Sequence, residues 1–258
     1  NLCGALEFAE KMSKIGTQPI IGTQINFKYG DTVGLLPLYA LNEDGYKRII
    51  ELSSLSYLTN DVLSEPHLDF DEVLKKSNGV SIFTGSIFGL FGQLFDKGKF
   101  KDIVELYSKL KLGFGDRFYI EIQRHDDLNE ESFEKFNLSK SFELKIPIIA
   151  TNEVYYLKKE MYEAHDALIC IKNKTYVSEK KRIRLSNHHY FKNDNEMYEL
   201  FSDLPEALVN NYNFPFRCSY RPLSSKPILP NISSKKSGNA DETLKEESLN
   251  GLKNKFKN

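Results

Sequence analysis

The chain has 258 residues, of which 40% are hydrophobic and 12% aromatic, and its 35 basic and 36 acidic residues nearly cancel. This length is enough for one large α/β domain, or for a medium domain with an appendage, and the balanced charge excludes a global field that attracts nucleic acid or an anionic membrane. Three widely separated cysteines and the lack of a membrane-spanning apolar run predict a cytoplasmic protein without disulfides or a membrane partner.

Helix and strand patterns alternate along the chain, which predicts a largely parallel sheet or barrel. Because the chain starts with Asn1 rather than Met, and Asn1 already reads as a helix cap, we expect it to begin inside a longer protein. Pro37, inside the second predicted strand, favours an edge position or a bulge for that strand. In chain order, the predicted elements are helix 1–16, strands 19–27 and 33–41, helices 42–55 and 69–76, strand 79–85, helix 98–112, strand 117–125, helix 129–145, strand 146–150, and helices 160–171, 193–201, 204–212 and 241–256.

The composition changes near the end of the chain, where Pro, Ser, Lys and Asn become frequent. This is typical of a linker. We therefore expect a first domain over residues 1–218, a linker over 219–240, and the first helix of a following region over 241–258.

Two predicted strands end in polar groups. In strand 117–125, Phe118, Ile120 and Ile122 are predicted to share one face. Strand 146–150 runs into Thr-Asn-Glu, and the next helix carries Met161, Ala164, Leu168 and Ile171 at helical spacing as its predicted apolar face. The carboxyl ends of parallel strands are where α/β enzymes place active-site residues.

Several segments, taken together and in this order, resemble the N-terminal region of the bacterial replicative DNA polymerase III alpha-subunit family. The helix start at residues 1–8 is similar to Asn-Leu-x-Gly-Ala-x-Glu-Phe, and the most specific segment joins Ala-Thr-Asn-Glu at 150–153 to Ala-His-Asp at 164–166. Further matches are Lys-x-Gly-x-x-Pro-Ile-Ile-Gly at 14–22, Asn-x-x-Gly-Tyr at 42–46, Phe-x-Ile-Glu-x-Gln-x-His at 118–125 and Leu-Phe-x-Asp-x-Pro-Glu-Ala-Leu at 200–208.

The resemblance implies a PHP domain, a distorted β/α barrel related to metal-dependent phosphoesterases. Here it would lack its first strand or strands and be followed by the linker and the start of a helical or palm region. The parent would be a DNA-directed DNA polymerase, a nucleotidyltransferase that uses Mg²⁺. Its catalytic aspartates would lie beyond Asn258, so we expect no catalytic residue and no cofactor in this chain.

The family's metal-ligand positions carry altered residues here. A Glu is replaced by Gln24, a His by Leu35, a Cys by Ser86, an Asp by Glu153 and a His by Tyr155. An amide, a hydrocarbon, a hydroxyl and a phenol are poor ligands beside the carboxylates, imidazoles and thiolates that hold divalent ions. We therefore expect a degenerate site without a metal.

Each of the remaining histidines, carboxylates and basic residues has a structural interpretation and a functional one. We expect His125 to be a solvent-accessible hydrogen-bonding residue rather than a residual ligand, and His165 with Asp166 to serve packing and capping. His188 and His189 are predicted to lie in a surface loop or edge strand, with incidental metal affinity as the alternative. Glu121 and Glu153 give a weak signal for paired acid/base carboxylates. The basic stretch 172–184 is predicted to be a solvated face, with contact to DNA phosphates or to a partner as the alternative.

The function expected from these features is structural. In the parent, this fragment would support the polymerase and dock the proofreading exonuclease, next to other replicase subunits, while DNA is held by downstream domains. One alternative is an active metal-dependent PHP phosphoesterase or pyrophosphatase whose site is completed by upstream histidines. A stand-alone interaction module is a third possibility.

Overall fold

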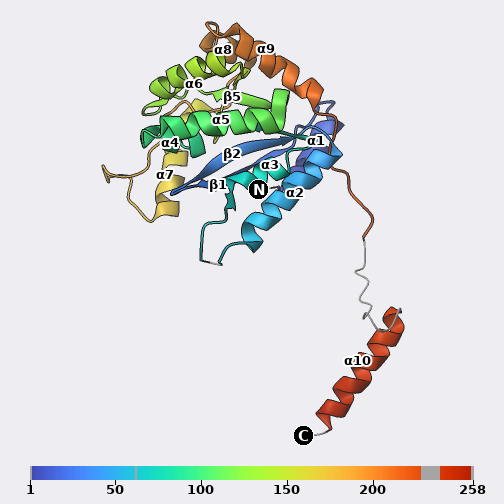
Figure 1. Ribbon diagram of the computed structural model, residues 1–258. Helices are drawn as coiled ribbons and strands as arrows, with labels where there is room; N and C mark the ends of the chain where they lie inside the picture. The colour runs from blue at the N-terminus through green and yellow to red at the C-terminus, as the bar shows by residue number, and fades with distance from the viewer. Residues whose placement is uncertain (1, 62, 228–238, 257–258) are drawn as a thin grey trace. The chain divides into compact units, whose positions relative to one another are not determined.

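The computed structural model describes residues 2–61, 63–227 and 239–256 (Figure 1). The chain divides into two compact units, residues 1–222 and 223–258. The first unit contains the sheet, and helix α10 (Ala240–Lys255) is the regular element described in the second. The predicted cap Asn1 and residues 228–238 of the predicted linker lie outside the described residues.

Six strands form one mixed sheet in the order β3-β1-β2-β4-β5-β6. β1, β2 and β4 pair antiparallel, whereas β3 pairs with β1, β5 with β4 and β6 with β5 in parallel. Over the described residues the sheet stays open, which confirms the α/β class and fits a barrel without its first strands. The strands are β1 (Gly22–Tyr29), β2 (Thr32–Ala40), β3 (Leu68–Asp69), β4 (Val80–Phe83), β5 (Phe118–Ile122) and β6 (Ile148–Ala150).

The prediction of a largely parallel sheet fails for the first half of the chain. Tyr29 pairs with Thr32, so β1 and β2 are joined by a two-residue turn in which Gly30 has a φ of 58°. A connection this short can join only antiparallel strands, and a positive φ in the turn matches their twist.

The predicted edge position of Pro37 is also wrong, because β2 lies in the interior of the sheet between β1 and β4. Pro37 faces Gln24 of β1, but pairing with β4 begins only at Leu38, opposite Ile82. On the β4 side, the missing N–H of proline therefore falls just before the ladder starts.

The predicted helices are present, with ends shifted by a few residues. Asn42 caps α2, since its side chain accepts a hydrogen bond of 2.9 Å from the backbone N–H of Gly45. The short helix α4 (Leu90–Asp96) was not predicted, because the glycines before it suggest a loop. The other helices are α1 (Ala5–Lys14), α2 (Glu43–Leu58), α3 (Phe70–Lys75), α5 (Phe100–Phe114), α6 (Glu130–Leu144), α7 (Tyr162–Asn173), α8 (Asp194–Leu200) and α9 (Pro205–Asn213).

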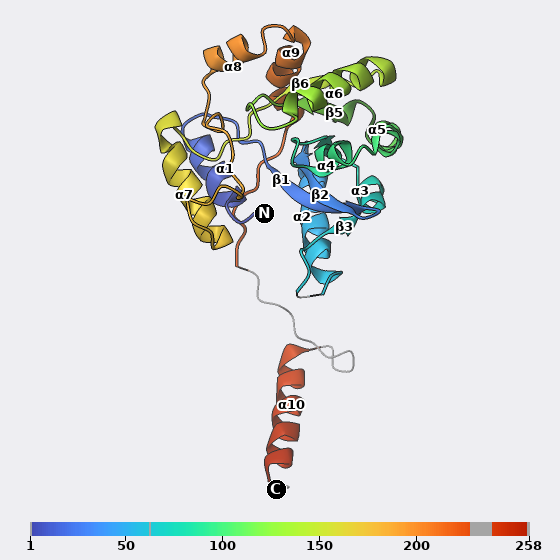
Figure 2. The ribbon, with the colours of Figure 1, turned by 90° about the vertical axis from the view of Figure 1, so that its left-hand side faces the viewer.

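Successive side chains of β5 point to opposite faces of the sheet, and the two faces pack in different hydrophobic clusters. Phe118, Ile120 and Ile122 all belong to the main core, as predicted, together with residues of α4, α5 and α6. Tyr119 belongs to a smaller cluster with Phe83, Ile149 and Phe214. Figure 2 shows α4 and α5 on one side of β2, and α1 and α7 on the other. Glu121 shares the face of Tyr119, because residues two apart in a strand point the same way.

The free edge of β6 is covered by side chains of α9. The side-chain amide of Asn210 donates a 2.8 Å hydrogen bond to the carbonyl of Ile148, and that of Asn211 donates to the carbonyl of Ala150. These bonds satisfy edge carbonyls that would otherwise invite pairing with another chain. In the described part of the chain, no helix combines the length and apolar character needed to cross a membrane.

The predicted apolar face of α7 is wrong. Met161, Leu168 and Ile171 are exposed, whereas Asp166 and Cys170 are the buried residues of the helix. The reason is an ion pair: both side-chain oxygens of Asp166 accept hydrogen bonds of 2.5 and 2.7 Å from Arg182. α7 therefore packs through a charged contact with the following segment.

Candidate functional site

A buried carboxylate lies where β4, β5 and β6 end. Glu121 is 4% exposed, and its carboxylate accepts hydrogen bonds from the hydroxyl of Thr151, from Gln123 Nε2 at 3.1 Å and from the backbone N–H of Gly85 at 3.0 Å. Burial raises the pKa of Glu121 to about 7, against the opposing effect of these hydrogen bonds. Glu121 thus ties the carboxyl ends of three neighbouring strands together.

Two histidines lie stacked beside this carboxylate network. The rings of His125, which follows β5, and of His189 have centroids 4.1 Å apart and planes inclined by 4°. Each residue is 1% exposed. The predictions of an accessible His125 and of a surface His189 are therefore wrong. Nothing in the local sequence around either residue signals that a segment 64 positions away covers it.

Each ring nitrogen of the pair faces a protein atom. For His125, Nδ1 lies 3.3 Å from Glu130 Oε1, and Nε2 lies 3.1 Å from Asn152 Oδ1 and 3.2 Å from the backbone N of Glu153. For His189, Nδ1 lies 3.1 Å from the carbonyl of Glu153, and Nε2 lies 3.0 Å from Asp127 Oδ2.

The turn that carries Asp127 is held by the first residue of α6. Glu130 Oε2 accepts hydrogen bonds from the backbone N–H groups of His125 at 2.6 Å, Asp126 at 2.8 Å and Asp127 at 3.3 Å. Asp126 and Asn129 have positive φ angles of 64° and 65°, which the short polar side chains of these residues tolerate. The turn is therefore a defined structure that fixes the position of Asp127.

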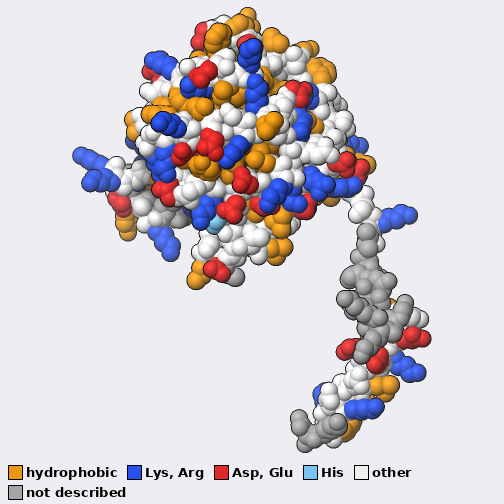
Figure 3. Space-filling model, viewed as in Figure 1, with side chains coloured by type: hydrophobic (Ala, Val, Ile, Leu, Met, Phe, Trp, Pro, Cys, Tyr) orange, Lys and Arg blue, Asp and Glu red, His pale blue; other side chains and the backbone are white. Residues whose placement is uncertain are grey.

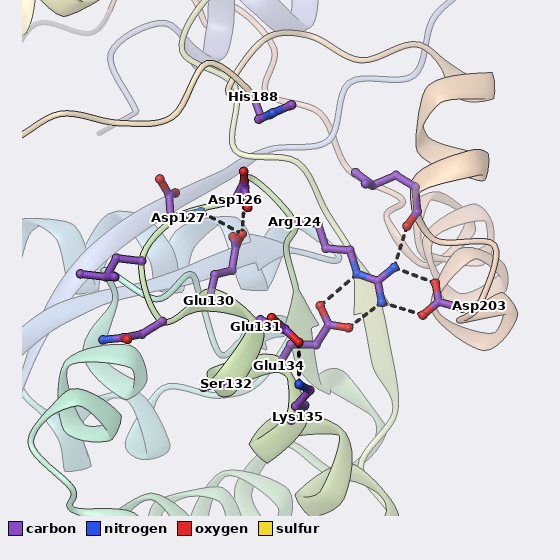
Figure 4. Close-up of a pocket in the computed structure, with 13 residues that line it drawn as sticks. Arg124, Asp126, Asp127, Glu130, Glu131, Ser132, Glu134, Lys135, His188 and Asp203 are labelled. Carbon is purple, nitrogen blue, oxygen red and sulfur yellow. Dashed lines mark hydrogen bonds and ion pairs between the residues drawn. The ribbon is translucent and has the colours of Figure 1, made fainter.

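A hollow of about 1070 Å³ opens next to this turn (Figure 4). Arg124 reaches into it and binds Glu134 through bonds of 3.0 and 2.5 Å and Asp203 through bonds of 2.6 and 2.8 Å. The charged side chains that line the hollow are mainly acidic, with Arg124 and Lys135 as its basic residues; the acidic ones are Asp126, Asp127, Glu130, Glu131, Glu134 and Asp203. Such a surface repels phosphate groups, so it is poorly suited to a nucleotide or to DNA.

Comparison with known proteins agrees with the resemblance in the motifs. Residues 1–125 match the family model described as PHP domain. The chain is 36% identical over 98% of its length to DNA polymerase III subunit alpha of Caulobacter vibrioides, and 37% identical over its whole length to that of Rickettsia felis. The protein of Borreliella burgdorferi with the same name is 34% identical over the whole chain.

This chain belongs to the PHP region of the DNA polymerase III alpha-subunit family. It spans 22 to 24% of the length of these relatives.

In this PHP region, the structure places the five altered ligand positions in different surroundings. Gln24 and Leu35 lie on the neighbouring strands β1 and β2 and line one small hollow. Ser86 lines a second small cavity, next to Glu121. Glu153 and Tyr155 follow β6, where the backbone of Glu153 contacts both stacked histidines.

The donors at these five positions do not fit a cluster of divalent ions. Leu35 has no donor atom, and Gln24 and Ser86 offer neutral oxygens. Burial, with the nearby charge of Glu153, raises the pKa of Tyr155, so its phenol stays protonated. Glu153 alone supplies an anionic ligand, whereas closely spaced divalent ions require several carboxylates and imidazoles.

The sequence motifs of this PHP region missed two of the residues that surround the histidines. Asp127 and Glu130 belong to a polar loop and a helix start without periodicity, whereas Asn152 lies in the Ala-Thr-Asn-Glu motif, which gave it no role. The predicted pair of Glu121 and Glu153 is only partly supported, because the charge of Glu153 helps to raise the pKa of Glu121 but no hydrogen bond joins them in the described structure.

Proposed function

We propose that this PHP region acts in the cytoplasm as a structural domain of a longer, DNA-polymerising alpha subunit. In this role it supports the polymerase and docks the proofreading exonuclease beside other replicase subunits. DNA and the Mg²⁺ of polymerisation are contacted by other parts of the parent. The names of the relatives support the polymerase parent, while the docking role extends beyond them.

The observation that carries this proposal is the closed hydrogen-bonding around Glu121. Its carboxylate takes up donors from the ends of β4 and β6 and from its own strand, as described above. A hydrolase leaves such groups open toward a metal-bound water or substrate. Here the polar groups around Glu121 hydrogen-bond to its carboxylate instead. The five family ligand positions contribute a single carboxylate, that of Glu153.

The groove between α5 and α6 is the surface best suited to docking. Phe95, Phe100 and Phe136 form its floor, with ring centroids 5.4 to 5.6 Å apart, and Phe100 is 46% exposed. The groove measures about 780 Å³, and its rim carries Lys101, Lys135 and Lys140. An aromatic floor with a basic rim matches a partner segment in which an apolar side chain is flanked by acidic ones.

Deleting residues 1–222 from the parent subunit tests the proposal. We expect the truncated polymerase to melt at a lower temperature and to lose co-purification with the proofreading exonuclease. Melting temperature and exonuclease affinity that both stay unchanged would rule out the structural and docking role.

A second function, phosphoester hydrolysis, gains some support from the buried histidine pair next to Asp127. We expect the purified chain to hydrolyse bis(p-nitrophenyl) phosphate no faster than buffer does, with or without Mn²⁺. Turnover that depends on Mn²⁺ and disappears in Glu153→Gln would establish this second function instead.

A further inference from the structure

Three side chains outside the family ligand positions converge in the interior of the first unit. One potential ligand atom each from His125, Asp127 and His189 lies within 4.8 Å of the others. We propose that these three residues bind one divalent transition-metal ion, for which Zn²⁺ is the best match. This site is independent of the structural and docking role proposed above.

The first support is the contact between His189 and Asp127. Nδ1 of His189 faces the carbonyl oxygen of Glu153 at 3.1 Å, so Nδ1 carries the proton in the neutral ring. Nε2 then presents a lone pair to Asp127 Oδ2, 3.0 Å away. A cation shared by the two atoms, either a proton or a metal ion, holds them this close. Two ligands bound to one Zn²⁺ at about 2.0 to 2.1 Å each lie roughly 3 Å apart.

The surroundings of His125 repeat this pattern. Its Nδ1 faces the Glu130 carboxylate at 3.3 Å, which leaves the lone pair on Nε2; there it accepts a hydrogen bond of 3.2 Å from the backbone N–H of Glu153, which a bound ion would displace. Metal-binding histidines typically donate their other N–H to a carboxylate or a backbone carbonyl, as His125 and His189 can do here. A donor set of two imidazoles and one carboxylate suits Zn²⁺.

A fourth oxygen faces the same ring. Asn152 Oδ1 lies 3.1 Å from His125 Nε2. Its amide is oriented by two bonds: Nδ2 donates to the carbonyl of Tyr190 at 2.9 Å, and Lys192 Nζ donates to Oδ1 at 3.0 Å. A fourth ligand therefore stands beside the three that define the site.

Binding of Zn²⁺ at this site requires that its charge be balanced and that one imidazole ring change its orientation. The carboxylates of Asp127 and Glu130 supply two negative charges against the dication, while Lys192 is the nearby cation, and burial lowers its pKa. The two imidazole planes are parallel, so one ring must tilt before both Nε2 lone pairs point at one ion. Asp127 and His189 need no such change.

Zinc titration of the tag-free full chain tests the site. After removal of metals with a chelator, we expect isothermal titration calorimetry and elemental analysis to give one Zn²⁺ per chain. His189→Gln and Asp127→Asn should weaken binding tenfold or more. The matched control is His188→Gln, because His188 precedes His189 in the chain but lies outside the cluster; it should bind within twofold of the wild type.

Two outcomes would overturn the inference. One is the absence of stoichiometric Zn²⁺ in a folded wild-type chain, which would leave a proton as the cation shared by His189 and Asp127. The other is equal loss in His188→Gln and His189→Gln, which would indicate adventitious surface binding. Circular dichroism of the metal-free variants distinguishes lost ligands from lost folding, because Asp127→Asn keeps the shape of the side chain.

Discussion

At the scale of single residues, the most unusual group is the Glu121 carboxyl, which is buried in a network of donors at the sheet's carboxyl edge. Sequence patterns placed Glu121 on a strand but could not show its burial, because the donors come from residues 36 positions before it and 30 after it. The stacked histidines illustrate the same limit. Contacts between distant loops depend on the whole fold, whereas periodicity reports only which way a segment faces.

Glu121 should make the stability of the chain depend on pH. Its pKa is about 7 in the folded protein, above the ordinary value near 4.5. The folded state therefore binds a proton that the unfolded state has released, and stability falls as pH rises from about 4.5 to about 7. The loss from this group is on the order of 3 kcal/mol.

Urea unfolding of the wild type and of Glu121→Gln between pH 4.5 and 8.5 checks this dependence. We expect the difference in unfolding free energy between the two proteins to shift in favour of the variant as pH rises. The control is Glu163→Gln on exposed α7, which should follow the wild type at every pH. A pH-independent difference between wild type and Glu121→Gln would show that folding does not raise the pKa of Glu121.

The ion pair of Asp166 and Arg182 gives a second prediction for single residues. Their side chains are 7% and 6% exposed, so removing one partner leaves the other buried and unpaired. We expect Asp166→Ala to lower the unfolding free energy and to open segment 174–186 to limited proteolysis. Arg184→Ala is the control, since Arg184 bonds Tyr162 from an exposed position. Equal protease resistance in both variants would contradict this role.

At the scale of elements, the sequence predicted most helices and strands because each has its own period and end signals. The start of α2 is an example: Asn42 caps it, and Gly45 is required because a Cβ there would meet the carbonyl oxygen of Gly79 at 1.8 Å. The wrong predictions for single elements result from contacts between segments that are distant in the sequence. The rule that proline is excluded from interior strands predicted an edge position for Pro37, but the pairing of β2 with β4 begins only at Leu38, so Pro37 leaves no bond of that ladder unmade.

The apolar face of α7 shows a different kind of failure. Spacing alone predicted burial of Met161, Leu168 and Ile171, yet the structure buries Asp166 with Arg182 on another face. Helical periodicity indicates an amphipathic helix, but it does not identify which neighbour that face meets. The basic stretch 172–184 was likewise predicted to be solvated, whereas the side chain of Arg182 is only 6% exposed in its pair with Asp166.

The cover of β6 by α9 gives a prediction at this scale. Replacing Asn210 and Asn211 together by Ala removes the donors to the carbonyls of Ile148 and Ala150. We expect a loss of about 1 kcal/mol for each hydrogen bond and faster aggregation on heating, measured by light scattering, because the edge becomes available for pairing. Asn213→Ala, at the end of the same helix, should leave both quantities unchanged. Aggregation at the wild-type rate in the double variant would show that the edge is protected by something else.

At the scale of the whole molecule, charge is spread without a dominant sign. Figure 3 shows basic and acidic side chains interspersed with hydrophobic ones over one face, in keeping with the near-equal totals. The length, composition and motifs were enough to predict the α/β class and the family, because these depend on many residues at once. The groove that we propose for docking could not be predicted in this way, since Phe95, Phe100 and Phe136 come from three different helices.

The affinity of the parent alpha subunit for its proofreading exonuclease tests the docking role most directly. Calorimetric titration should show binding of the wild type, and weakening by tenfold or more in Phe100→Glu and in Lys101→Glu, which changes the rim without touching the core. Leu112→Glu, an exposed position on the same helix, should bind as the wild type does. Undiminished binding by both groove variants, or the same affinity after removal of residues 1–222, would contradict the account.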